Sequence, residues 1–265
     1  QRDGVDVEKI VPMHIGVDTD MFFPKNNVSL RNSLRKMIGV SPEDKMILTV
    51  GGDVTSKGAQ EMMHALANID KELGNWKYVC KSWPSECADG WREDEMKIAE
   101  DLGISDKVIF IDDEFSPEFM NDLLNIADVY AAPSRLEGFG MIQVEAMAAG
   151  IPVISINKMG PGETIVHNKT GFLAKVGEEI KLESEWIYPW MGFKKKEVVK
   201  FDSPKTFAYR ADIDDLSKYS LKLLTDGNLR AKMGAAGREH VLKNLDYRKI
   251  AKDMVDITKE RLDLE

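Results

Sequence analysis

Two glutamates, Glu137 and Glu145, are separated by seven residues in the part of the chain best suited to chemistry. Gly138, Phe139 and Gly140 lie just after the first glutamate and predict a turn that opens a short helix. Backbone N–H groups at a helix start attract anions, and the helix dipole adds to this attraction. Glu145 should lie about one turn inside the helix, where its carboxylate can accept hydrogen bonds from a diol such as ribose. The arrangement suits a sugar attached to a phosphate, and the plainer alternative is two solvated glutamates beside a tight turn.

A second glycine turn carries a lysine toward another expected helix. Gly51 and Gly52 let the backbone approach a ligand closely, and Lys57 supplies a point charge for phosphate. The turn matches neither the P-loop nor the dinucleotide-binding fingerprint, so an ordinary strand-to-helix turn stays open as an alternative. Lys81 directly follows the next apolar run and should point to the same edge. A further glycine turn, around Gly160, would offer more amides to the same cleft.

Short apolar runs alternate with helical patterns along the chain. The runs predict strands at Met46–Val50, Tyr78–Cys80, Val108–Ile111, Val129–Ala132, Val153–Ile156 and Gly171–Ala174. Helical spacing predicts helices at about 58–70, 91–102, 117–126, 140–149, 214–225, 228–243 and 247–262. This alternation predicts an α/β fold, a Rossmann-like parallel sheet with helices on both faces. Ligands of such sheets bind beyond the carboxyl ends of the strands, where the turns described above fall.

Bulk composition limits the classes of function. The 265 residues can bury a sizeable core, and the net charge of −9 argues against nonspecific nucleic-acid binding. Cys80 and Cys87 have no histidine nearby, so neither a zinc site nor a disulfide framework is indicated, and a reducing cytoplasm fits best. The scattered histidines give little support for a catalytic triad. The acidic run at residues 112–114 is expected to be a solvated loop rather than a metal site, because no spaced partner completes a coordination set.

Two segments interrupt the alternation of strands and helices. Residues 1–24 contain two prolines and a turn-like Gly-Val-Asp, and we interpret them as a linker leading into the domain. Residues 178–210 hold aromatic residues followed by three consecutive lysines, namely Trp186, Tyr188, Trp190, Phe193 and Lys194 to Lys196. Aromatics beside lysines can touch a membrane or an acceptor. We expect instead that this insertion packs its aromatics on its own domain and solvates its lysines.

The stretch from Pro133 to Gly150, with its Glu-seven-Glu pattern, resembles the signature of the retaining glycosyltransferases of family 4. These enzymes have the two-domain GT-B fold. The similarity continues in the same order along nearly the whole chain, apart from residues 178–210. It is carried by Pro12, Gly16-Val17-Asp18, Lys57-Gly58, Val108-Ile109-Phe110, Gly150-Ile151-Pro152-Val153-Ile154 and Gly171-Phe172-Leu173.

The resemblance implies a domain organisation. The chain would be the C-terminal, donor-binding half of an enzyme whose N-terminal acceptor domain is missing, and its first residue, Gln1, fits a fragment. It would consist of the linker at 1–24, a nucleotide-sugar-binding domain at 25–245 with the insertion at 178–210, and a terminal crossover helix at 246–265. Such a fragment would bind the donor and transfer nothing alone.

The resemblance also implies roles for individual residues. Glu145 would hold the ribose hydroxyls, Glu137 would face the donor sugar as the catalytic residue, and Lys57 would neutralise the β-phosphate. The sugar and diphosphate would be surrounded by the amides of Phe139, Gly140 and Met141. Such enzymes are usually metal-independent, and no cofactor is expected beyond the UDP-, GDP- or ADP-sugar that serves as donor. Retention is attributed in this family to front-side attack by the acceptor.

The chain departs from the family at the phosphate end. Gly52 stands where the family usually has an arginine, so the diphosphate loses a bidentate donor. Lys81 stands where the family often has glycine, and we expect it to take over part of that role. The alternative is a lysine that only ends a strand in solvent.

Other functions stay open on the same architecture. One class is a nucleotide-sugar 2-epimerase or a glycan phosphorylase, although nothing marks a lysine for pyridoxal phosphate. Another is a non-catalytic nucleotide-sugar-binding module, against which the intact Glu137 and Glu145 argue. The sequence identifies neither the base, the sugar nor the acceptor, and it leaves a peripheral membrane contact open.

Overall fold

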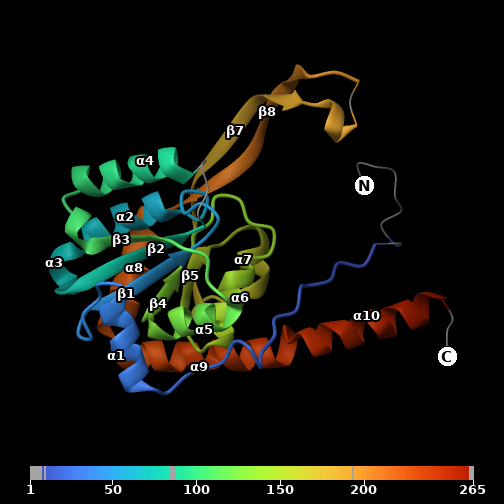
Figure 1. Cartoon of the computed structure of the whole chain (residues 1–265). Coiled ribbons are helices and arrows are strands. Elements are labelled where there is room, and N and C mark those ends of the chain that lie inside the picture. The colour runs from blue at the N-terminus through green and yellow to red at the C-terminus, as the bar shows by residue number, and fades with distance from the viewer. Residues whose placement is uncertain (1–7, 9, 84–87, 193, 263–265) are drawn as a thin grey trace.

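A six-stranded parallel sheet forms the centre of the protein (Figure 1). The computed structural model describes residues 8, 10–83, 88–192 and 194–262. The strands lie in the order β3-β2-β1-β4-β5-β6. They are β1 Lys45–Val50, β2 Trp76–Ser82, β3 Val108–Asp112, β4 Val129–Ala131, β5 Val153–Ile156 and β6 Gly171–Ala174. The predicted fold class and all six predicted strands are confirmed, because each strand lies within two residues of its expected bounds.

Helices cover both faces of the sheet, and a separate apolar cluster fills each side. Successive residues of β1 alternate between the two clusters, so Ile47 packs with Leu66 of α2 while Leu48 packs with Val144 of α6. The helix predicted at 58–70 is divided into two, α2 and α3. The helices are α1 Val28–Met37, α2 Ala59–Asn68, α3 Asp70–Leu73, α4 Ala88–Asp101, α5 Pro117–Ile126, α6 Met141–Ala148, α7 Met159–Thr164, α8 Ile213–Thr225, α9 Gly227–Asn244 and α10 Tyr247–Leu262, with short 3₁₀ turns at Ser105–Lys107 and Pro189–Met191.

Helix α1 and the short helix α7 lie outside the predicted helices, and α1 is the longer of the two. Asn27 caps it, with a side chain that accepts a hydrogen bond from the N–H of Leu30. Its anchor is polar, because the fully buried Arg35 donates to the carbonyl oxygen of Ile126 at 2.8 Å and pairs with Asp128 at 2.9 Å. Leu34 also packs against the core, but it is only partly buried, so the one fully buried side chain of this helix is charged.

The segment after β6 forms a long antiparallel ribbon, where the sequence suggested an insertion without strands. Its strands are β7 Val176–Ile187 and β8 Glu197–Ala211, and they project away from the body of the domain (Figure 1). The expectation that its aromatics pack on the domain is wrong, since Trp186 is 53% and Trp190 is 80% exposed. Phe193 lies outside the described residues. A ribbon with both faces largely in water lacks the alternation that identifies a half-buried strand.

The start and the end of the domain lie side by side. Backbone hydrogen bonds join Val17 to Leu245 at 2.8 Å and to Tyr247 at 3.0 Å. The hydroxyl of Thr19 donates to the carboxylate of Asp246 at 2.5 Å. The predicted linker and the predicted crossover helix are therefore joined at these residues. We call this contact the clasp, and α10 extends from it (Figure 1).

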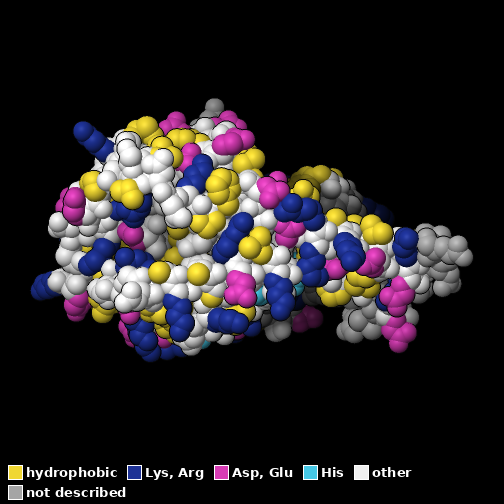
Figure 2. Space-filling view, turned by 90° about the horizontal axis from the view of Figure 1, so that it is seen from below, with side chains coloured by type: hydrophobic (Ala, Val, Ile, Leu, Met, Phe, Trp, Pro, Cys, Tyr) yellow, Lys and Arg dark blue, Asp and Glu magenta, His cyan; other side chains and the backbone are white. Residues whose placement is uncertain are grey.

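Helix α10 is exposed along its length and has no buried residue. Seen from below, its side of the molecule mixes positive, negative and hydrophobic side chains without one large patch of a single kind (Figure 2). Its exposed large apolar side chains are Tyr247, Met254, Val255 and Leu262. Within the described residues, none of the helices combines the length and the apolar character needed to cross a bilayer.

Candidate functional site

A cleft of about 340 Å³ opens at the carboxyl ends of β1 and β4. One wall is the lysine turn (residues 51–58), and the other is the Gly-Phe-Gly turn (residues 138–140) with the first turn of α6. This is the edge at which parallel α/β sheets bind ligands. The lining residues are Ile15, Val50, Gly51, Gly52, Lys57, Trp83, Tyr130, Glu137, Phe139, Gly140, Met141, Ile142 and Gln143.

Two glycines shape the wall formed by the Gly-Phe-Gly turn. Gly140 is the N-cap of α6 and has φ +89°, a conformation that other residues rarely adopt. Gly160 lies in α7, where a Cβ atom would come within 2.5 Å of both the Gly138 carbonyl oxygen and the Phe139 Cα. The close packing of α7 therefore fixes the turn, and Gly160 supports the cleft without lining it.

Lys57 and Glu137 form an ion pair in the cleft. The Lys57 Nζ lies 2.6 Å from the Glu137 Oε2, and the two side chains are 23% and 16% exposed. The turns that carry them are joined by their backbones, since the N–H of Arg135 donates to the Ser56 carbonyl oxygen at 2.8 Å. A cation and a carboxylate so placed can receive phosphate oxygens and sugar hydroxyls, respectively.

Glu145 lies half-buried in α6, close to the cleft but outside its lining. Burial raises the pKa of its carboxyl to about 7. Among the described residues its carboxylate has no hydrogen-bond partner. Tyr130, which does line the cleft, has its pKa raised by burial and then by the nearby Glu145 and Glu137 carboxylates. A partly desolvated carboxylate beside the cleft can accept hydrogen bonds from a hydroxylated ligand.

Lys81 is buried at the end of β2 and does not line the cleft. Lys81 is only 1% exposed, so the alternative of a lysine that ends a strand in solvent is wrong. Its ammonium lies 3.9 Å from the ring centroid of Trp83 and 5.4 Å from that of Phe115. Burial lowers the pKa of this ammonium. Trp83 lines the cleft, so Lys81 contacts a residue of the cleft wall without lining the cleft itself.

The structure gathers most of the predicted site residues in one cleft. Gly51, Gly52, Lys57, Glu137, Phe139, Gly140 and Met141 line it, whereas Lys81, Gly138, Glu145 and Gly160 lie beside it. Sequence reasoning missed Ile15, Val50, Trp83, Tyr130, Ile142 and Gln143. Ile15 comes from the segment interpreted as a linker, and the neighbouring His14 ring lies 5.8 Å from the Phe139 ring. Trp83 directly follows β2 and Tyr130 lies within β4, so their place near the carboxyl ends of the strands was the available indication.

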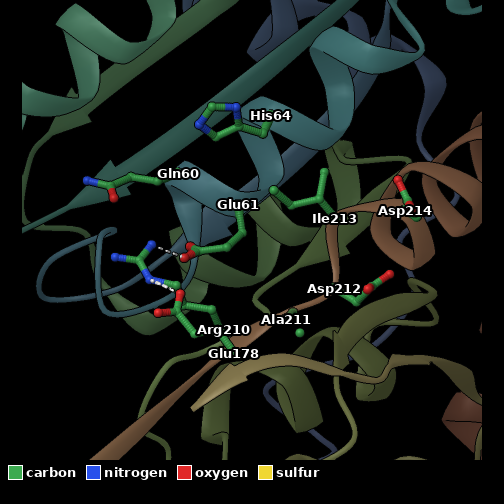
Figure 3. Close-up of a pocket in the computed structure, with 10 residues that line it drawn as sticks. Gln60, Glu61, His64, Glu178, Arg210, Ala211, Asp212, Ile213 and Asp214 are labelled. Atoms are coloured by element: carbon green, nitrogen blue, oxygen red, sulfur yellow. Dashed lines mark hydrogen bonds and ion pairs between the residues drawn. The ribbon is translucent and has the colours of Figure 1, made fainter. Parts of the chain in front are cut away.

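A larger hollow of about 570 Å³ lies at the base of the ribbon and contains none of the predicted site residues (Figure 3). Its floor is Glu61 of α2, which is 3% exposed. Glu61 pairs with Arg210 of β8 at 2.6 Å and with Arg135, beside the Gly-Phe-Gly turn, at 2.9 Å. The Tyr209 N–H donates to the Arg135 carbonyl oxygen at 2.8 Å. The ion pairs of Glu61 and this backbone hydrogen bond therefore connect the ribbon to the turns that form the cleft.

The remaining candidate centres have ordinary structural partners. Asp112, first in the acidic run, pairs with Arg92 and accepts a hydrogen bond from Ser82. Throughout the part of the chain that the structure describes, no three His, Cys, Asp or Glu side chains are grouped to hold a metal ion. Cys80 is a buried free thiol whose pKa is raised by burial, and Cys87 lies outside the described residues.

Comparison with known proteins matches the chain to one family. The family model described as "Glycosyl transferases group 1" matches residues 31–187. A GDP-mannose-dependent alpha-(1-6)-phosphatidylinositol monomannoside mannosyltransferase from Mycobacterium tuberculosis is 27% identical over 248 residues, 91% of this chain and 53% of that protein. An N-acetyl-alpha-D-glucosaminyl L-malate synthase from Bacillus anthracis is 26% identical over 191 residues, 69% of this chain and 47% of that protein. The chain spans about half the length of the curated relatives it matches.

Solved structures share the fold. The C-terminal domain of a glycosyl transferase group 1 family protein (LpcC) from Francisella tularensis has a TM-score of 0.64 and 21% identity, with 87% of this chain and 99% of that chain covered. Anabaena Alr3699/HepE, in complex with UDP and glucose, has a TM-score of 0.75 and 17% identity, with 98% of this chain and 59% of that chain covered. These likenesses confirm the predicted fold, a Rossmann-like domain of the GT-B type.

Proposed function

The chain belongs to the group 1 glycosyltransferases, and from this premise we propose that it is the donor-binding half of a retaining enzyme. In this proposal the cleft binds a nucleoside diphosphate sugar, and the glycosyl group passes to an acceptor held by another domain. The observation that carries the proposal is the single cleft that brings Lys57, Glu137 and the start of α6 together, with Glu145 beside it.

The diphosphate would bind between the lysine turn and the start of α6. Lys57 supplies a positive charge, and the N–H groups at the N-terminus of an eight-residue helix supply hydrogen bonds and a favourable dipole. Gly52 leaves room at the lysine turn, because a Cβ atom there would meet no other atom within 4 Å. We propose that protein cations and amides stabilise the departing diphosphate in place of a metal ion.

Glu145 would hold the ribose and Glu137 the donor sugar. Two vicinal hydroxyls can donate to the Glu145 carboxylate, and a raised pKa indicates that this carboxyl gains by accepting hydrogen bonds from a ligand. Glu137 lines the cleft and pairs with Lys57, which would place its carboxylate where the sugar meets the phosphate. Glu137 is therefore the residue we assign to the reacting centre.

The transfer exchanges one bond at the anomeric carbon for another. The bond from that carbon to the diphosphate oxygen breaks, and a bond to the acceptor oxygen forms on the same face. The acceptor proton then passes to the departing diphosphate. The positive charge of Lys57 and the amides of α6 stabilise the negative charge that develops on the leaving group.

The acceptor would be bound outside this chain. The curated relatives are about twice as long as the matched region, which leaves space for a second domain in each. We propose that residues 25–245 form the donor domain, that residues 1–24 lead into it, and that residues 246–265 form the crossover helix. The backbone hydrogen bond between Val17 and Tyr247 supports this proposal, because it brings the two segments together.

The class of donor is supported by two relatives with different bases. The mycobacterial relative is named for GDP-mannose, and the Anabaena structure contains UDP and glucose. Titration of the chain with UDP, GDP and ADP in the presence of EDTA, followed by calorimetry, tests the proposal. We expect one of them to bind without added metal, and a ligand at 100 Kd would stabilise the fold by about 2.7 kcal/mol. Binding only with Mg²⁺ or Mn²⁺ would overturn the metal-free claim, and no binding of any nucleotide would overturn the donor assignment.

A further inference from the structure

The far end of the ribbon carries an exposed aromatic surface. We define the ribbon tip as residues 186–199 and the ribbon stalk as residues 176–185 and 200–211. Trp186 and Trp190 are 53% and 80% exposed, and further apolar side chains beside them reach solvent. These are Met191, Val198 and Val199. Large apolar side chains gathered on a projecting tip are unusual for a free surface and indicate a binding function.

The aromatic rings of the tip are held together rather than scattered. Tyr188 and Trp190 are stacked, with ring centroids 5.6 Å apart and an angle of 21° between their planes. The Lys196 ammonium lies 4.9 Å from the Trp186 ring centroid and 5.2 Å from that of Tyr188. Trp186, Tyr188 and Trp190 are therefore connected through the Lys196 ammonium and the ring stack, while Lys195 pairs with Glu197 at 2.9 Å.

Charge is segregated along the ribbon. The tip carries three exposed lysines, Lys194 to Lys196, against a single glutamate, Glu197. The stalk carries five acidic and four basic residues, and the whole chain has a net charge of −9. Positive charge thus collects at the tip of an acidic protein, next to the aromatic rings.

The length of the ribbon separates this charge from the body. The β7–β8 ladder runs from the pair Val176–Ala211 to the pair Ile187–Glu197. The twelve residues of β7 span roughly 40 Å at about 3.3 Å per residue. Salt screens charges beyond roughly 8 Å at physiological ionic strength, so the acidic body does not cancel the field of the tip.

We propose that the ribbon tip docks on the surface of an anionic lipid bilayer. Tryptophan and tyrosine rings bind at the headgroup level of a bilayer, where one part of the ring is apolar and the polar edge is hydrated. Lysines beside them pair with anionic headgroups. A standard protein interface takes roughly 20–30 residues from each partner, and the tip has fourteen positions in all. Its size and its charge therefore fit a lipid surface better than a protein partner.

Vesicle co-sedimentation of the full chain tests the docking. We expect the chain to bind vesicles that contain phosphatidylglycerol and to stay in solution with pure phosphatidylcholine. The triple variant Lys194→Glu, Lys195→Glu, Lys196→Glu should bind the anionic vesicles at least about a hundredfold more weakly. The matched control reverses three stalk lysines, Lys181, Lys200 and Lys205, to glutamate, which changes the net charge equally and should keep most of the binding.

A second measurement isolates the aromatic part. Trp186→Ser with Trp190→Ser should weaken binding and abolish a blue shift of tryptophan fluorescence on anionic vesicles, while Lys57-dependent nucleotide binding stays unchanged. Equal losses in the tip and stalk triple variants, or no preference for anionic vesicles, would overturn the proposal. So would a tip variant that changes the oligomeric state of the lipid-free chain, since that result assigns the tip to a second copy.

Discussion

The Lys57 ammonium and the Glu137 carboxylate lie 2.6 Å apart although eighty positions separate them in the chain. Each belongs to a different wall of the cleft, so the pair joins the lysine turn to the Gly-Phe-Gly turn across the site. In the proposed function a diphosphate competes with Glu137 for Lys57. The affinity of the cleft for an anion then depends on how easily this ion pair rearranges.

Neutralising Glu137 should therefore strengthen the binding of a free nucleoside diphosphate. Glu137→Gln removes the competitor of Lys57 and a like charge beside the phosphates, and we expect an increase of about fivefold, or ~1 kcal/mol. Lys57→Ala should weaken the same binding and leave that of the bare nucleoside nearly unchanged. Calorimetry with both ligands measures these effects, with the exposed Glu163→Gln as the control. If Glu137→Gln binds the nucleoside diphosphate with unchanged affinity, then Glu137 does not compete with the phosphates for Lys57.

Glu145 should make the stability of the protein depend on pH. Its pKa is raised from 4.5 to about 7 in the folded state. The folded state therefore keeps a proton that the unfolded chain releases, so stability is highest below about pH 4.5 and falls as the pH rises to about 7. Glu145→Gln should remove this dependence and raise the free energy of unfolding near pH 8 by at most about 3 kcal/mol. Urea denaturation near pH 5 and pH 8 measures it, and equal pH profiles for the parent and the variant would contradict the assignment.

The same substitution should weaken nucleotide binding. Glu145→Gln replaces a charged acceptor of ribose hydroxyls with a neutral amide, and loss of a charge-assisted hydrogen bond costs about 1.5–3 kcal/mol. If Glu145→Gln is more stable than the parent and binds UDP or GDP less well, then Glu145 serves ligand binding rather than stability. Calorimetry near pH 8 decides, because the parent carboxyl is then ionised.

Lys81 should assist Lys57 from its buried position behind Trp83. Lys81→Met keeps the packing and removes the charge, and it should weaken diphosphate binding several-fold while nucleoside binding changes little. Lys77→Met, on the same strand but at its other end, is the control. Gly52→Arg has room for its Cβ and should partly restore diphosphate binding in Lys81→Met. If Lys81→Met binds the diphosphate like the parent, the ammonium serves only the packing against Trp83.

The buried Glu61 should hold the ribbon and the Gly-Phe-Gly turn in place. Glu61→Gln leaves Arg135 and Arg210 without their shared carboxylate, and breaking a buried pair costs about 3–5 kcal/mol. Arg210→Met should cost less than Arg135→Met, because the Arg210 side chain is 37% exposed and that of Arg135 only 13%. Urea denaturation of the three variants gives the order, and equal costs for the two arginine variants would contradict it.

The sequence predicted the parts of the site that depend on local order. Each turn follows a strand and opens a helix, and parallel strands bring such turns to one edge whatever the intervening chain does. For that reason Lys57 and Glu137 could be assigned to one cleft without any knowledge of their distance. The two turns are indeed joined through Arg135 and Ser56.

The sequence could not predict features set by contacts between distant residues. Glu61 and Arg210 are 149 positions apart, and their pairing depends on where the ribbon leaves the sheet. Lys81 was expected to face the cleft, but its ammonium lies against the Trp83 ring, and such a rotamer choice has no local pattern. The docking of helix α1 depends on Arg35, whose partners Ile126 and Asp128 are about ninety positions away in the chain.

The ribbon can change length without disturbing the contacts that hold its base. Its anchors to the body, Tyr209 and Arg210, lie on the body side of the facing pair Ile180 and Ala208. A two-residue hairpin turn can close an antiparallel pair at such a point, and strands grow or shrink in steps of two residues without exchanging their faces. The length of the ribbon and the residues at its tip can therefore evolve, or be grafted, as a module independent of the domain that carries it.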